Sequence, residues 1–128
     1  MSELWLKICF FYDKIEKIRS AVMVTEEIKM LAERIRDAVH PDKIYLFGSF
    51  ARNEERADSD YDFYIVVPDS TPDRSIVSQQ AYLSMRGMKR RPVDIVVGSV
   101  SGFARRRLQQ TLEQTVEDEG VVLYEKRG

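Results

Sequence analysis

The chain of 128 residues has one cysteine and one histidine, and only six glycines and four prolines. Cys9 alone cannot form an internal disulfide, and Cys9 with His40 is too few for a multi-cysteine zinc site. A Ser–His–Asp triad would have to use His40. The 20 basic and 21 acidic residues give a formal net charge of −1, so the overall charge creates no attraction to nucleic acid or anionic membranes. Carboxylates, hydroxyls and basic side chains remain as the chemical tools.

Long apolar runs are also missing. The longest apolar stretch, residues 4–12, is interrupted by Lys7 and is far shorter than the roughly 20 residues that span a bilayer. It lacks a basic segment before it and a small-residue cleavage site after it, as a signal peptide would require. We therefore expect a cytoplasmic protein with one core, no membrane contact and no direct nucleic-acid binding.

The first segment carries apolar residues at helical spacing. They are Leu4, Ile8, Phe11, Ile15, Ile18 and Val22. This spacing predicts an amphipathic helix over residues 1–22, followed by a domain over residues 23–128. Three interpretations of the helix stay open. It packs on its own domain, it forms a homo-oligomer seam with a second copy, or it is an upstream extension of a unit beginning at Met23.

The rest of the chain alternates between helical and strand patterns. Strands are predicted over residues 43–47, 60–67, 92–97 and 121–124. A first helix is predicted from N-cap Thr25 to His40-Pro41. A second is predicted from N-cap Thr71, with Pro72 at the first helical position, to about Arg86, with Gly87 as C-cap. A third, single helix is predicted from about Phe103 to Gly120. The alternation predicts an α/β (α+β) fold in which a small mixed sheet is flanked by helices.

Gly48 and Ser49 directly follow the first predicted strand. Glycine allows a ligand to approach the backbone closely. Residues 49–54 are expected to begin a short helix, and the free N–H groups of a helix start bind anions. A Gly-Ser pair taken alone is more often a simple turn.

Asp60 and Asp62 stand at the head of the second predicted strand. Because side chains alternate along a strand, both carboxylates point to one face, while Tyr61, Phe63 and Ile65 point to the other and form core. Two converging carboxylates repel each other unless a proton or a cation lies between them. Hard oxygen ligands of this kind suit Mg²⁺. The alternative is a solvated strand end with two exposed acids.

Asp94 interrupts the apolar run of residues 93–97. A buried carboxylate without a partner is costly, so Asp94 is expected to have one. If this strand neighbours the strand of Asp62, Asp94 completes a three-carboxylate cluster. The alternative is an ion pair with one of the basic residues before the strand, Lys89, Arg90 or Arg91.

Two basic clusters remain, residues 89–91 and residues 105–107. Such clusters are more often solvated faces. The alternative is contact with a triphosphate, a nucleic acid or an acidic protein partner.

Together these residues resemble the signature of the DNA polymerase β-like nucleotidyltransferase superfamily. The signature is Gly48-Ser49, ten residues, Asp60-x-Asp62 and a third acid, Asp94, on a later strand. The chain is most similar to the minimal nucleotidyltransferases, from about Val24 to Tyr124. One departure is Asn53, where the family often has glycine. Asparagine tolerates the left-handed backbone conformation better than most residues.

The resemblance implies the nucleotidyltransferase fold and Mg²⁺-dependent transfer of a nucleotidyl group from ATP. It implies that Asp60 and Asp62 hold Mg²⁺ against the triphosphate and that Gly48-Ser49 positions the phosphates. Asp94 would share a metal and take the proton of the attacking hydroxyl. Arg52 is close enough in sequence to contact phosphates, although the alternative of an exposed ion pair is the more usual role for such a residue.

The resemblance also implies a partner. Minimal members commonly act as antitoxins beside a helical HEPN ribonuclease toxin and add AMP to a toxin tyrosine. Only 34 residues follow Asp94, which is little material for an acceptor pocket. We therefore expect a helical HEPN-type toxin as the acceptor. Two alternatives stay open: a small-molecule nucleotidyltransferase of the aminoglycoside-modifying type, and a non-catalytic antitoxin that neutralises its toxin by contact alone.

Overall fold

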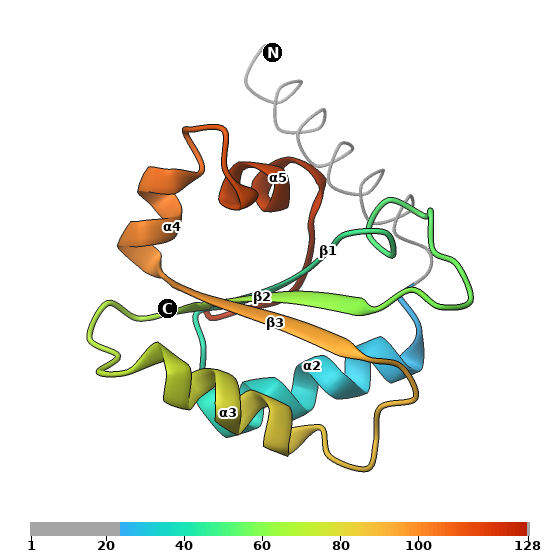
Figure 1. Cartoon of the computed structure of the whole chain (residues 1–128). Helices are drawn as coiled ribbons and strands as arrows, with labels where there is room; N and C mark the ends of the chain where they lie inside the picture. The colour runs from blue at the N-terminus through green and yellow to red at the C-terminus, as the bar shows by residue number, and fades with distance from the viewer. Residues whose placement is uncertain (1–23, 128) are drawn as a thin grey trace, which may run out of the picture.

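The computed structural model describes residues 24–127, in which helices cover both faces of a four-stranded sheet (Figure 1). In chain order the elements are α2 (Glu26–Val39), β1 (Lys43–Phe47), β2 (Tyr61–Val67), α3 (Arg74–Ser84), β3 (Val93–Ser99), α4 (Val100–Arg106), α5 (Leu112–Glu119) and β4 (Val121–Glu125). The strand order is β3-β2-β1-β4. Since β1 is antiparallel to β2 and β4 while β3 is parallel to β2, the predicted mixed sheet is confirmed. The helix predicted over residues 1–22 lies outside the described residues.

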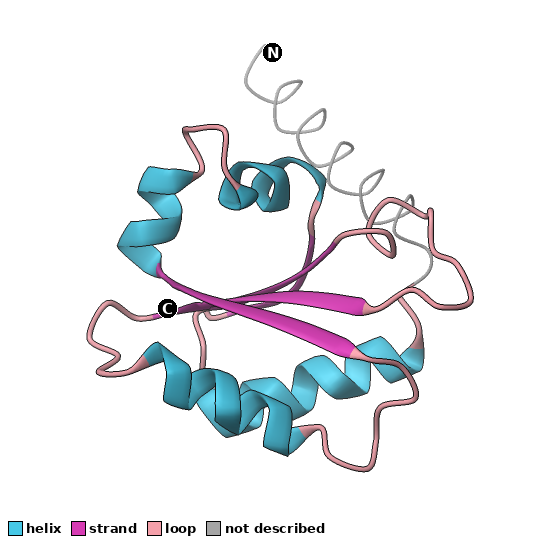
Figure 2. Cartoon of the chain, in the orientation of Figure 1, coloured by secondary structure: helices cyan, strands magenta, loops and turns pink. Residues whose placement is uncertain are grey.

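Helices α2 and α3 lie on one face of the sheet and α4 and α5 on the other (Figure 2). The first face holds the larger core, in which Ile28, Leu31 and Ile35 of α2 pack with Phe63 and Ile65 of β2. All five side chains are fully buried or nearly so, and burial of a side chain of this size stabilises the fold by about 1.5–3 kcal/mol. As predicted, the odd-numbered positions of β2 face this core.

The second face has a smaller, aromatic core. The Tyr45 and Phe103 rings stack with centroids 5.4 Å apart, and the Tyr64 ring meets Phe103 edge-on at 5.3 Å. The buried carboxylate of Glu113 accepts hydrogen bonds from the Tyr64 hydroxyl (3.3 Å) and from Arg106 Nε (2.8 Å). These contacts fix α4 and α5 on the sheet.

The ends of α2 are as predicted, whereas those of α3 differ. Thr25 caps α2 by accepting from the Ile28 N–H at 3.3 Å. The N-cap of α3 is Asp73 rather than Thr71, because the Asp73 carboxylate accepts from both the Ser75 N–H (2.9 Å) and the Ser75 hydroxyl (2.6 Å). The helix ends at Ser84, so Gly87 belongs to the turn that follows it.

The single helix predicted from Phe103 to Gly120 is wrong, because the chain breaks it into α4 and α5. Thr111 caps α5 by accepting from the Gln114 N–H (3.3 Å), while its hydroxyl donates to the Arg106 carbonyl (2.6 Å). Leu108, which the helical pattern placed on the apolar stripe, is 76% exposed. Gly120 ends α5 as predicted, with its N–H donating to the Val116 carbonyl at 2.8 Å.

The strands lie where they were predicted, with shifted boundaries. β2 begins at Tyr61 instead of residue 60, β3 covers Val93–Ser99 instead of residues 92–97, and β4 extends to Glu125. None of the helices in the described range is long and apolar enough to cross a membrane.

Candidate functional site

Asp62 and Asp94 are paired in register on the parallel strands β2 and β3. Neighbouring strands lie about 4.8 Å apart, and residues paired in this way present their side chains on the same face. Asp60 lies two residues before Asp62, just outside the strand, and Tyr61 between them donates its N–H to the Pro92 carbonyl at 3.0 Å. Three carboxylates therefore gather where β2 and β3 begin.

The charges of this cluster act on Asp62. Its carboxylate is half-buried, and burial together with the negative charges of Asp94 and Asp60 raises its pKa to about 6. The positive charge of Arg52 acts in the opposite direction, lowering the pKa of Asp62. Asp62 is thus the centre of the cluster and carries an unfavourable negative charge at neutral pH.

Gly48 contacts Asp62 from the neighbouring strand end. The register pairs Phe47 of β1 with Asp62, which brings Gly48 against the carboxylate. A Cβ atom at position 48 would overlap Asp62 Oδ2, and the backbone here is left-handed, with φ of 77°. Any larger residue at this position would displace the carboxylate, so glycine is required on two grounds.

Residues 49–54 form one helical turn instead of the start of a helix. The Glu54 N–H donates to the Ser49 carbonyl (2.9 Å) and the Asn53 N–H to the Phe50 carbonyl (3.4 Å). With Asn53 left-handed at φ of 57°, this is the Schellman arrangement that normally ends a helix. The conformation expected of Asn53 from its place in the motif is the one observed.

The two other residues predicted to bind phosphates, Ser49 and Arg52, lie in this turn. Ser49 is half-buried beside Gly48. Arg52 forms ion pairs with Glu54 (3.0 Å) and Glu119 (3.6 Å), the exposed pairing that sequence reasoning gave as the alternative. Because Arg52 also lowers the pKa of Asp62, its guanidinium remains within electrostatic reach of the carboxylates.

The expectation that Asp94 is buried is wrong. Asp94 is exposed near the start of the edge strand β3, directly after the buried Val93. Within residues 24–127 no ion pair joins Asp94 to a basic side chain. The alternative of a structural ion pair is therefore not what the structure shows. Lys89 lies over the Tyr82 ring instead, at 5.8 Å.

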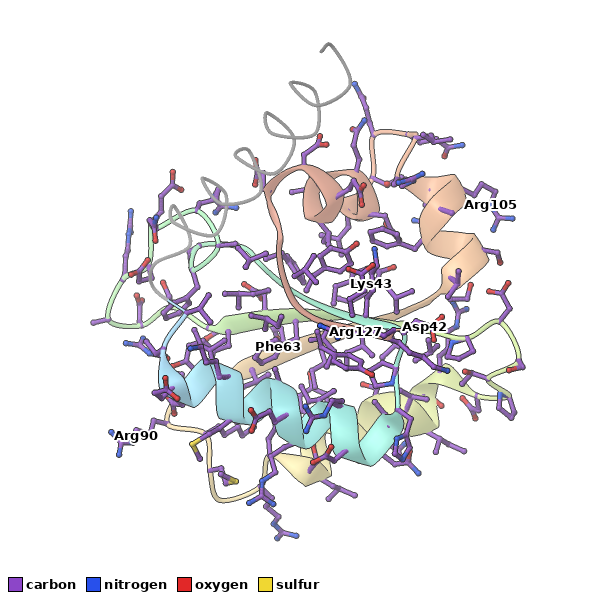
Figure 3. All side chains as sticks on the ribbon, turned by 180° about the vertical axis from the view of Figure 1, so that it is seen from behind. Asp42, Lys43, Phe63, Arg90, Arg105 and Arg127 are labelled. Atoms are coloured by element: carbon purple, nitrogen blue, oxygen red, sulfur yellow. The ribbon has the colours of Figure 1, made fainter. Side chains whose placement is uncertain are left out.

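In each of the two basic clusters, some side chains are exposed to solvent and others make specific contacts. In residues 105–107, Arg106 pairs with Glu113 (2.8 Å) and Arg107 with Glu117 (3.1 Å), whereas Arg105 points into solvent (Figure 3). In residues 89–91, Arg91 donates hydrogen bonds to backbone carbonyls just before Asp60. Sequence reasoning missed this role, because nothing local links Arg91 to a loop more than 30 residues away.

The carboxylates could supply only part of the ligand set of a metal ion. Among the described residues no three acidic, cysteine or histidine side chains come close enough to form a complete ligand set. Mg²⁺ is usually held by one or two carboxylates, with water and substrate phosphates completing its coordination. Asp62 and the neighbouring carboxylates whose charges raise its pKa offer oxygen donors of this kind. A bound cation would relieve the repulsion between these carboxylates. The residues present fit Mg²⁺ bound together with a phosphate-bearing substrate.

A model of the family described as "Polymerase beta, Nucleotidyltransferase" matches residues 26–127, which include all the residues of the carboxylate cluster. The chain belongs to this nucleotidyltransferase family. A search of curated proteins gave no match.

Two solved structures are similar to the chain. The crystal structure of a "putative nucleotidyltransferase" from Sulfolobus solfataricus has a TM-score of 0.56 and 19% sequence identity, covering 86% of this chain and 87% of that one. At this identity the likeness shows a shared fold. A crystal structure of a toxin-antitoxin with AMP-PNP has a TM-score of 0.49 and 20% identity, covering 80% of this chain and 76% of that one.

Proposed function

We propose that this protein is a Mg²⁺-dependent nucleotidyltransferase that transfers AMP from ATP to a tyrosine hydroxyl of a cognate HEPN ribonuclease toxin. Membership of the nucleotidyltransferase family gives the class of reaction. The observation that carries the proposal is the position of Asp62, half-buried against Gly48 and beside Asp60 and Asp94. A fold that holds three negative charges together at a cost to its own stability is suited to binding a cation.

Each residue of the cluster has a proposed task. Asp60 and Asp62 would hold Mg²⁺, which when bound supplies a Lewis acid that neutralises the charge of the phosphoryl oxygens. Gly48 and Ser49 would position the triphosphate, since the absence of a side chain at position 48 lets phosphate approach the backbone. Asp94 would accept the proton of the tyrosine hydroxyl. The hydroxyl oxygen then bonds to the α-phosphorus, the bond to the bridging oxygen breaks, and pyrophosphate leaves.

The exposure of Asp94 supports an acceptor from outside the domain. Asp94 lies on the edge strand β3, where a hydroxyl of another molecule can reach it. Among the described elements after β3, α4 and α5 cover the second face of the sheet and β4 extends the sheet. The choice of a toxin tyrosine rests on the minimal nucleotidyltransferases that the Gly48-Ser49 and Asp60-x-Asp62 motif resembles. An added AMP would place bulk and negative charge where RNA must approach the toxin.

The test uses the product of the neighbouring gene, provided that it encodes a small helical protein with an Arg-x₄-His motif. The two proteins are mixed with ATP and Mg²⁺, and both are weighed by mass spectrometry. The expected result is a gain of AMP on a tyrosine of the toxin, which is absent when the double variant Asp60→Asn/Asp62→Asn replaces the wild type. An unmodified but inhibited toxin would indicate a non-catalytic antitoxin. Labelling of an aminoglycoside instead of the toxin would indicate the small-molecule enzyme.

A further inference from the structure

The Arg91 side chain anchors the segment that leads into Asp60. Its Nη1 donates to the backbone carbonyls of Arg56 (3.3 Å), Ala57 (2.8 Å) and Ser59 (3.3 Å). The other hydrogen bonds of this segment are local, from Ser59 N–H to the Arg56 carbonyl (3.0 Å) and from Arg56 N–H to Ser59 Oγ (2.7 Å). Residues 56–59 have no regular secondary structure. Among the described residues, the Arg91 side chain supplies the hydrogen bonds that connect them to the rest of the domain.

The same guanidinium contacts the loop of Gly48 and Ser49. It lies over the ring of Phe50, 5.3 Å from the centroid, and Phe50 is buried directly after Ser49. The Phe50 ring packs on Tyr61, with centroids 4.8 Å apart, and Tyr61 stands between Asp60 and Asp62. Arg91 therefore joins the phosphate-binding turn to the strand of the two carboxylates.

Tyr61 is fixed from the opposite side by α2. Its hydroxyl donates to Glu27 Oε2, and Glu27 Oε1 accepts from the Arg90 N–H at 3.0 Å. Burial and the Glu27 carboxylate raise the pKa of Tyr61 to about 12, while Arg91 lowers it through its charge and a side-chain hydrogen bond. Tyr61 is thus neutral. It has an acidic neighbour in Glu27 and a basic neighbour in Arg91.

We propose that Arg91 is a positioning residue for the carboxylate cluster. It lies three positions before Asp94, and it holds residues 56–59 and Phe50 together, which fixes Asp60 relative to Asp62 and Asp94. A guanidinium suits this task because one of its nitrogens donates to the backbone carbonyls while its planar face lies over an aromatic ring. The inference rests on the proposed function, since it assigns Arg91 to the same site.

The test compares three variants of the full chain. Arg91→Met removes the hydrogen bonds and the charge, Arg91→Lys keeps the charge, and Arg90→Met is the matched control, because the exposed Arg90 side chain points away from the protein (Figure 3). For each variant we measure kcat and KM for ATP in AMP transfer, calorimetric binding of ATP with Mg²⁺, and hydrogen exchange of the backbone amides.

In Arg91→Met we expect kcat to fall by about 10- to 100-fold, the loss typical of a reacting group displaced by about 1 Å. The KM for ATP should change much less, and exchange should become faster in residues 56–62 but not in α2. Arg91→Lys should restore part of kcat, because an ammonium reaches fewer of the carbonyls. Arg90→Met should match the wild type in every measurement.

Three results would overturn the inference: wild-type kcat in a folded Arg91→Met protein, faster exchange throughout the domain, or failure of both Arg91 variants to fold. The second and third would make Arg91 a general stabilising residue. Exchange and calorimetry need no acceptor. If the wild type itself transfers no AMP, the proposed function fails. Faster hydrogen exchange in residues 56–62 of Arg91→Met would still support the positioning role of Arg91. Unchanged hydrogen exchange there would contradict that role.

Discussion

Asp62 of β2 and Asp94 of β3 face each other across the only parallel pair in the described sheet. The parallel pairing places both carboxylates at the same end of their strands, although 31 residues separate them in the sequence. Their repulsion, added to burial and to the charge of Asp60, raises the pKa of Asp62 to about 6. The site therefore opposes the stability of the domain until something neutralises it.

The first prediction concerns pH and stability. Because the pKa of Asp62 rises from 3.8 to about 6 on folding, the folded state holds this proton more tightly, and the free energy of unfolding falls as the pH rises from about 4 through 6. Asp62→Asn should remove this dependence and make the metal-free protein more stable at pH 7.5 by up to about 3 kcal/mol. The difference should vanish near pH 4. Urea unfolding at both pH values measures it, with the exposed Asp58→Asn as control.

The second prediction concerns the nucleotide. Asp60→Asn together with Asp62→Asn should abolish Mg²⁺-dependent binding of ATP and leave the domain folded, because the removed charges repel each other. Calorimetric titration with ATP, with and without Mg²⁺, gives the affinity, and circular dichroism monitors the fold. Unchanged affinity in the double variant would remove both residues from the site.

The third prediction separates binding from chemistry at Asp94. Because Asp94 is exposed and makes no ion pair among the described residues, Asp94→Asn should leave the fold intact. It should keep part of the affinity for ATP while the rate of transfer falls by about 10²- to 10⁴-fold, the usual contribution of a general base. Single-turnover kinetics at saturating ATP measure the rate. Turnover close to that of the wild type would show that Asp94 takes no part in the reaction.

The fourth prediction concerns Asn53. Its left-handed backbone disfavours residues with a Cβ and no local hydrogen-bonding group, so Asn53→Ala should destabilise the domain by about 1 kcal/mol. Asn53→Gly is the matched variant, because glycine adopts this conformation freely and should cost less than alanine. The melting temperatures of the two variants give the order. Equal melting temperatures would show that the turn at residues 49–54 does not depend on this conformation.

The fifth prediction concerns Arg106 and Glu113. The buried Glu113 carboxylate takes a 2.8 Å hydrogen bond from Arg106, while its Oε2 has no partner within the described structure. Arg106→Met would leave this carboxylate without its cation and should lower stability by about 1–3 kcal/mol. Arg105→Met removes the same charge from the preceding position, where the side chain points into solvent, and should change stability little (Figure 3). A similar loss in both variants would contradict a specific Arg106–Glu113 pair.

The features that sequence reasoning predicted correctly depend on local signals. Thr25 before an amphipathic stretch and Gly120 after one mark the ends of helices, and the alternation in β2 separates Asp62 from Phe63. The break between α4 and α5 also had a local signal, because Thr111 and Gln114 form the Thr-x-x-Gln pattern of a helix start. The helical spacing of apolar residues across the break concealed it.

Other features had no local signal. The exposure of Asp94 depends on which parts of the sheet tertiary packing leaves uncovered, and the apolar residues around Asp94 carry no signal of it. The role of Arg91 depends on residues 56–59, which tertiary folding brings next to it. Sequence reasoning placed Asp60, Asp62 and Asp94 in one cluster, and in the structure Asp62 is paired with Asp94 and the charges of Asp60 and Asp94 both act on Asp62. Their catalytic roles stay predictions.

The mixed sheet also gives the site an order of assembly during folding. Gly48 meets Asp62 through the antiparallel pairing of β1 and β2, which closes a loop of only the residues 48–60. Asp94 reaches Asp62 only through the parallel pairing, which requires residues 68–92, with α3 among them, to cross over the sheet first. Contacts that close longer loops form more slowly. A newly made chain is therefore expected to gain its glycine–carboxylate contact early and its full carboxylate cluster only when the crossover is complete, and the appearance of the proposed activity should then report the docking of β3.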